Sequence, residues 1–185
     1  PHVPAICARA ERLLSQLDAT ARELAKQQPL RMVVLASRPL LGWAQEARLK
    51  FIEMTAGRIA VMAESYLGLR HGPMSFVDPD TMVLCLVSTD PHRRRYESDL
   101  IAELGAKGLG VVVAIQPDDA GIAPIFESVD PVAPELPDEL RTPFEILFPQ
   151  LLAWRLSVNF GLNPDSPSPD GVITRVVQGV SIYER

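Results

Sequence analysis

The sequence predicts an α/β protein of three layers, in which helices cover both faces of a parallel sheet. Four short apolar runs alternate with amphipathic helical segments, a pattern typical of βαβ units. The runs are apolar at nearly every position, as in strands that are buried on both faces. With 185 residues, the chain is long enough for one sizeable core and short for two domains.

The first half of the chain gives two helices and two strands. Leucine and alanine recur at helical spacing over 10–28, and a proline follows. The run "LRMVVLAS" predicts a strand at 30–37, and a second helix is expected at 42–57, where a glycine ends it. The run "RIAVMAES" predicts the next strand at 58–65.

The second half continues the alternation. Strands are expected at 81–88 ("TMVLCLVS") and 109–116 ("LGVVVAIQ"), with a helix at 96–108 between them. A final helix over 139–161 is expected to be interrupted at Pro149. Residues 1–163 would form one domain, with the helix 10–28 leading into it. Residues 164–185 would form an extended tail that begins in a loop rich in proline and serine.

The composition excludes several classes of function. Hydrophobic residues make up 47% and charged residues 22%, as in soluble globular proteins, and the net charge of −5 argues against nucleic acid or a membrane as the main partner. No segment has the length of a membrane span or the layout of a signal peptide. Two cysteines, of which Cys85 lies in an apolar run, give no disulfide or zinc pattern. A cytoplasmic location is the default expectation.

One helix face carries groups that could move protons. Glu46, Lys50 and Glu53 share a face of the helix expected at 42–57. Such a stripe is more often a solvated set of ion pairs. His71, in "RHGPMSF", follows the second strand and is expected near the carboxyl edge of the sheet, where ligands bind. It is either a polar turn residue or a group presented for chemistry, and the pattern alone leaves this open.

The segments "EARLKFIE", "RHGP", "STDP" and "TRVVQGVSIYE" together resemble a known family. They are similar to the second sugar-isomerase (SIS) domain of D-galactosamine-6-phosphate deaminase/isomerases, also called tagatose-6-phosphate ketose/aldose isomerases. The isomerase half of glucosamine-6-phosphate synthase is a more distant relative. The resemblance implies a SIS, flavodoxin-like fold.

The resemblance also implies roles for the candidate residues. Glu53 matches the glutamate that shuttles a proton between C1 and C2 of an opened sugar phosphate, and His71 matches the histidine of ring opening. Glu46 and Lys50 match the supporting acid and lysine. Neither a metal nor an organic cofactor is required. In the synthase relatives this histidine comes from a neighbouring subunit, which implies a homodimer or a larger homo-oligomer.

The sequence departs from the family pattern around the phosphate. Two-domain members hold the sugar phosphate in a Ser/Thr-rich turn of their first SIS domain, and no such segment is found here. The turn after the first strand has Ala36 and Arg38 in place of two glycines, with Ser37 as its lone hydroxyl. Met74 and Gln178 stand where relatives have lysines. The chain is therefore interpreted as the second half of a two-domain enzyme.

The expected substrate is a phosphorylated amino sugar or ketose, with Ser37, Arg38, Arg70 and Gln178 as substrate-binding residues. The reaction would be aldose–ketose proton transfer, with ammonia release from a hexosamine 6-phosphate. Two alternatives stay open: a non-catalytic sugar-phosphate-binding or dimerisation SIS module, and an unrelated flavodoxin-like binding protein. The absent phosphate turn favours the non-catalytic SIS module. The retained glutamates and His71 argue against it, because a binding module has no need of a proton shuttle.

Overall fold

Helices and strands alternate along the chain in the computed structural model, which describes residues 3–116, 121–122, 125–166, 168, 170–171 and 179–183. The strands are β1 (Arg31–Ala36), β2 (Ala60–Glu64), β3 (Met82–Leu86), β4 (Val111–Ile115) and β5 (Glu127–Val129). The helices are α1 (Val3–Ala25), α2 (Leu41–Met54), α3 (Tyr66–His71), α4 (Pro91–Ala106), α5 (Asp138–Glu145) and α6 (Leu147–Asn159), with a 3-10 turn, η1, at Met74–Phe76.

These five strands form one parallel sheet in the order β2-β1-β3-β4-β5. Val34 of β1 lies opposite Ala63 of β2 on one side and Leu84 of β3 on the other. The strand order therefore reverses direction at β1. The connections that leave β1 and β3 diverge at such a point, and they open a crevice at the carboxyl edge of the sheet.

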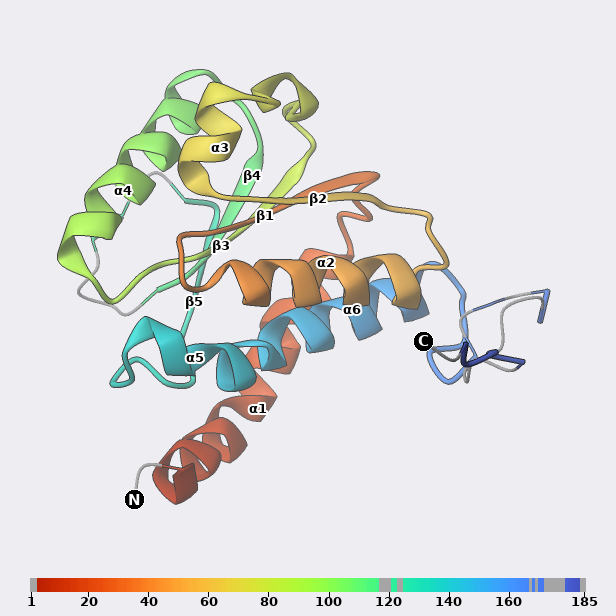
Figure 1. The fold of residues 1–185 in the computed structure, drawn as a ribbon. Coiled ribbons are helices and arrows are strands. Elements are labelled where there is room, and N and C mark those ends of the chain that lie inside the picture. The colour runs from red at the N-terminus through yellow and green to blue at the C-terminus, as the bar shows by residue number, and fades with distance from the viewer. Residues whose placement is uncertain are drawn as a thin grey trace.

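The sheet is covered on both faces, which makes three layers (Figure 1). Successive strand residues point to opposite sides, so Val34 packs with the layer of α1, α2 and α6, whereas Val33 and Leu35 pack with the layer of α3 and α4. Figure 1 shows α5 on the same side of the sheet as α1, α2 and α6. The expected α/β fold with a parallel sheet is confirmed.

The expected strands are confirmed with slightly shorter bounds, and the helices need corrections. The first helix begins at Val3 rather than at residue 10. The helix expected at 139–161 is two helices, which meet at Ile146 instead of breaking at Pro149. Pro149 has no N–H to donate to the carbonyl four residues earlier, at Glu145, so α5 stops there. The proline instead lies in the first turn of α6, where that N–H is not needed. The sequence patterns did not predict α3 and β5, which have six and three residues.

Only part of the expected tail can be compared with the structure. Asn163 and Ser166 close a short turn by an isolated bridge, and residues 179–183 form neither helix nor strand. Residues 172–178, and with them Gln178, lie outside the described residues. The extended tail and the domain boundary at 163 stay predictions. Within the described ranges, no helix combines the length and apolar character needed to cross a membrane.

A buried cluster of charges joins α5 to the end of β3. Arg141 is completely buried, and it lies 3.3 Å from both Asp138 and Glu145. Its guanidinium also donates to the backbone carbonyl of Val87, at 2.8 Å. Glu145 in turn accepts the backbone N–H groups of the loop that precedes α5, at 132 and 133. Every member of the cluster thus has partners, as buried charges require.

We expect Arg141→Ala to lower the free energy of unfolding by about 3–5 kcal/mol, because it leaves Asp138 and Glu145 as uncompensated buried carboxylates. Urea unfolding would measure the loss. The control is Arg95→Ala on α4, because Arg95 is exposed and should change stability by less than about 0.5 kcal/mol. Equal effects of the two substitutions would contradict the role given to Arg141.

Candidate functional site

A lysine held between two carboxylates lies on the outer face of α2. The ammonium of Lys50 is 2.9 Å from Glu53 and 3.6 Å from Glu46. The hydrogen bond to Glu53, together with both carboxylate charges, raises the pKa of Lys50 above its usual value. Trp43, Ala44, Ala47 and Phe51 bury the opposite face of α2. The sequence prediction of one shared helix face is therefore confirmed, and half of the Glu53 side chain is open to solvent.

His71 does not lie at the carboxyl edge of the sheet, where the sequence analysis placed it. The Ser65 hydroxyl accepts the N–H of Gly68 and starts α3 directly after β2. His71 is the last residue of α3, and its side chain is exposed. Arg70 pairs with Glu103 of α4 at 2.8 Å, near the end of α4 that is remote from that edge. Helix α3 thus carries both residues away from the crevice.

The expected site residues form two separate groups in one chain. Helix α2 packs on one face of the sheet, and α3 packs on the other. Figure 1 shows the sheet between the two helices. Glu53 and His71 therefore belong to helices in different layers of a single copy. Among the described residues, the side chain of His71 makes no hydrogen bond or ion pair, and Gln178 lies outside the described residues.

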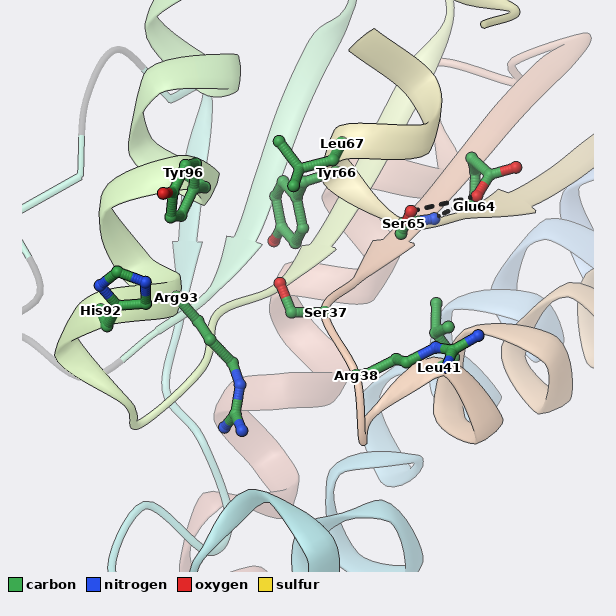
Figure 2. Close-up of a pocket in the computed structure, with 10 residues that line it drawn as sticks. All are labelled: Ser37, Arg38, Leu41, Glu64, Ser65, Tyr66, Leu67, His92, Arg93 and Tyr96. Atoms are coloured by element: carbon green, nitrogen blue, oxygen red, sulfur yellow. Dashed lines mark hydrogen bonds between the residues drawn. The ribbon is translucent and has the colours of Figure 1, made fainter. Parts of the chain in front are cut away.

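A pocket of about 450 Å³ opens where the strand order reverses, at the carboxyl edge. Residues that follow β1, residues at and after the end of β2, the start of α2 and the first turns of α4 contribute to its walls (Figure 2). The lining residues are Ser37, Arg38, Leu41, Glu64, Ser65, Tyr66, Leu67, His92, Arg93 and Tyr96. Of the three expected substrate-binding residues that the structure describes, Ser37 and Arg38 line this pocket and Arg70 does not.

A buried carboxylate lies behind Ser37. Glu97 of α4 is fully buried, and it accepts the hydroxyl of Ser37 at 2.6 Å and the backbone N–H of Ser88 at 2.9 Å. Burial raises the pKa of Glu97 to about 7 from 4.5, and the two hydrogen bonds act in the opposite direction. Glu97 thus links the connection after β1 to the connection after β3.

The same network continues to α5 through Asp138. The hydroxyl of Ser88 and the backbone N–H and hydroxyl of Thr89 donate to Asp138, and Arg93 lies 3.2 Å from it. Burial by itself would raise the pKa of Asp138, but these hydrogen bonds and the charge of Arg141 lower it overall. Asp138 therefore stays ionised, while Glu97 is close to half protonated near neutral pH.

Glu97, Asp138 and Arg141 were not among the predicted site residues, although the sequence carries a signal for each. Glu97 precedes Leu100, Ile101 and Leu104 at helical spacing, so a charged residue occupies the apolar face of its helix. Asp138, Arg141 and Glu145 share one face of α5 in the same way. A charge at a core position of an amphipathic helix indicates a buried polar network.

The expected burial of the Cys85 thiol is confirmed. Cys85 is buried, and burial raises its pKa to about 12. The hydroxyl of the adjacent Tyr66 donates to the carbonyl of Leu86. In the part of the chain that the structure describes, no three His, Cys, Asp or Glu side chains are grouped so that they could hold a metal ion.

Comparisons with known proteins agree with the resemblance seen in the sequence. No protein-family model matches the chain. It is 37% identical, over 179 residues, to the D-galactosamine-6-phosphate deaminase AgaS of Shewanella sp. (strain ANA-3). The aligned region covers 94% of this chain and 43% of that protein. The D-galactosamine-6-phosphate deaminase AgaS of Escherichia coli is 37% identical over 155 residues. The chain thus spans a little under half the length of these curated relatives.

Solved structures give the same relationship. The tagatose-6-phosphate ketose/aldose isomerase of Escherichia coli is 32% identical and superimposes with a TM-score of 0.74, over 94% of this chain and 47% of that one. The C-terminal domain of glucosamine-fructose-6-phosphate aminotransferase from Francisella tularensis, at 19% identity and a TM-score of 0.65, shares the fold. The chain is therefore a SIS-fold relative of one half of these deaminases and isomerases.

The raised pKa of Glu97 predicts a specific dependence of stability on pH. Because the folded protein binds this proton more tightly than the unfolded chain does, protonation of Glu97 stabilises the fold at low pH. That contribution is lost as the pH rises from about 4.5 to about 7, by up to about 3 kcal/mol.

Glu97→Gln should remove this slope, and thermal unfolding between pH 5 and pH 8 would measure it. The histidines are present in both proteins, so the difference between the two curves isolates Glu97. Parallel curves for the two proteins would show that Glu97 does not titrate in this range.

Proposed function

From its relationship to the D-galactosamine-6-phosphate deaminases and tagatose-6-phosphate isomerases, we propose that this chain is the second SIS domain of a hexosamine 6-phosphate isomerase/deaminase. The observation that carries the proposal is the group formed by Glu46, Lys50 and Glu53 on the outer face of α2. A carboxylate held beside a fixed cation is suited to moving a proton next to a carbonyl. The outward position leaves the group open to a second polypeptide segment that would complete the site.

The chemistry assigned to Glu53 is proton transfer between two carbons. With the sugar in its open-chain form, the carboxylate of Glu53 takes the proton from C2 of the amino aldose. The electron pair of the C–H bond forms the C1–C2 double bond while the oxygen at C1 takes a proton from water, which gives an enaminol. The same carboxyl group returns the proton to C1. Water then adds to C2 of the resulting imine, and ammonia leaves, so the product is a ketose 6-phosphate. Because its pKa is raised, Lys50 stays an ammonium ion that positions Glu53 and is a poor nucleophile.

Ring opening is assigned to His71 of a second copy of the chain. Within one copy, α2 and α3 lie on opposite faces of the sheet, so this histidine has to serve another copy's Glu53. This places the site at a contact between subunits and requires a homodimer or a larger assembly. Arg70, adjacent to His71, would bind substrate only by leaving Glu103. Gln178 and the phosphate-binding turn of a preceding SIS domain would supply the remaining contacts.

We expect Glu53→Gln to lower ammonia release from D-galactosamine 6-phosphate by about a hundredfold or more, because the amide cannot accept the proton. The assay uses this chain in place of the C-terminal half of the Shewanella relative, which supplies the other half. Deuterium uptake at C1 and C2 of the sugar in heavy water would follow the proton transfer directly. The thermal midpoint should stay unchanged, since Glu53 is half exposed.

Glu23→Gln is the matched control, because Glu23 and Lys26 form an equally spaced pair on exposed α1. It should leave both rates unchanged. Deuterium uptake that persists in Glu53→Gln would remove Glu53 from the reaction. A wild-type chimaera that binds the sugar phosphate without exchange or ammonia release would favour a binding module over an enzyme.

The shared site makes a second prediction. Glu53→Gln and His71→Gln proteins should each be inactive, and mixing them with subunit exchange should restore about a quarter of the wild-type rate. In a dimer, random exchange puts about half of the molecules in mixed pairs, and each mixed pair holds one intact site of two. Size-exclusion chromatography would establish the exchange. No recovery after demonstrated exchange would place both residues in sites of single copies.

A further inference from the structure

The pocket at the carboxyl edge is not accounted for by the proposed reaction. It lies where the strand order reverses, which is the usual ligand position in open α/β sheets. Leu41, in its wall, is the first residue of α2, and Glu53 lies twelve residues further along the helix, about 18 Å by its rise per residue. An open-chain hexose phosphate is shorter than this. A ligand in the pocket cannot reach the Glu53 of its own copy.

The pocket carries cationic and hydrogen-bonding groups that suit an anion. Among the described residues, the guanidinium of Arg38 has no hydrogen-bond or ion-pair partner, and Figure 2 shows it at the pocket wall beside Leu41. Arg93 and His92 stand across the pocket at the start of α4. Arg93 is paired with Asp90 at 3.4 Å and with Asp138 at 3.2 Å, so its position is fixed.

The acidic groups nearby are occupied by the protein. Glu64 accepts the backbone N–H and the hydroxyl of Ser65. Glu97 lies behind Ser37 and accepts the hydrogen bond of its hydroxyl, so Ser37 closes the back of the pocket and does not donate this hydroxyl to a ligand. The wall thus carries one free arginine, one arginine paired with two aspartates, a histidine and the carboxylate of Glu64. Guanidinium groups bind phosphate oxygens by paired, charge-assisted hydrogen bonds.

The apolar part of the wall indicates a ligand larger than a free inorganic anion. Leu41, Leu67 and the rings of Tyr66 and Tyr96 line the space beside the cations. His92 and Tyr96 meet edge to face, with ring centres 5.4 Å apart. Apolar and aromatic side chains of this kind pack against the carbon skeleton of a small ligand, while polar groups fix its orientation.

We propose that this pocket is a second binding site, separate from the α2 site, for a small phosphate monoester whose phosphate is held by Arg38 and Arg93. The proposal does not depend on the isomerase reaction, because it rests on the pocket and its charges alone. It changes the role expected for Ser37 and Arg38 in the sequence: Arg38 binds a ligand of its own pocket, and Ser37 forms the back wall of that pocket.

The test measures binding of D-tagatose 6-phosphate, D-tagatose and inorganic phosphate to this 185-residue chain. Calorimetry gives the affinities, and amide chemical shifts in NMR locate the bound ligand. The phosphate ester should bind, inorganic phosphate should bind more weakly, and the free sugar should not bind. The shifts should change at Ser37, Ser65 and the start of α4. Arg38→Ala should weaken binding roughly tenfold or more. Arg95→Ala, an equal loss of charge outside the pocket, should leave it unchanged.

Three results would overturn the proposal: no binding of the ester, equal weakening by both arginine substitutions, or shift changes confined to residues 46–54. The last result would locate the ester on α2 and leave the proposed function standing. If the chimaera shows no proton transfer but the shift changes at Ser37 and Ser65 are retained, the proposed function fails and the pocket proposal stands. The two proposals can therefore fail separately.

Discussion

The carboxyl edge of the sheet depends on a single buried carboxylate. Glu97 accepts one hydrogen bond from Ser37, after β1, and one from Ser88, after β3, and these are the two strands between which the topology reverses. The connections diverge at this point, and without a shared partner their polar groups would be buried unsatisfied. Through Ser88 and Asp138 the network reaches Arg141, so the position of α5 and the back of the pocket are set by the same set of hydrogen bonds.

The direction of the outer face of α2 is fixed by the packing of the opposite face of the helix. Trp43, Ala47 and Phe51 are fully buried against the sheet and α6, and this orients the face with Glu46, Lys50 and Glu53 outward. The group is therefore held by a rigid helix and not by a loop, which keeps the carboxylate of Glu53 and the ammonium of Lys50 in one geometry. Glu53 lies twelve residues along α2 from Leu41 of the pocket wall, so the domain presents two distinct polar surfaces along one helix.

The periodicity of apolar residues was sufficient to predict the layers of the fold, but it did not predict the connections between the strands and helices. The strands and the shared face of α2 follow from local patterns, because alternation and helical spacing depend on neighbours in the chain. The position of His71 depends on whether the chain leaves β2 as a turn or as a helix. That choice was decided by the Ser65 cap, a single side-chain hydrogen bond. The partners of Glu97, and the carbonyl of Val87 to which Arg141 donates, lie 9 to 60 residues away, and no local pattern specifies them. The missed β5 has only three residues, too few to show a period.

The placement of α2 and α3 on opposite faces of the sheet separates folding from the acquisition of activity. Each copy can bury its core and satisfy its charges while Glu53 and His71 remain in different layers. If the two residues serve one reaction, a correctly folded single copy is a silent form, and turnover begins only above the concentration at which copies associate. Dilution would then act as an off switch without unfolding any molecule, and the dissociation constant of the assembly would set the lowest abundance at which the protein works.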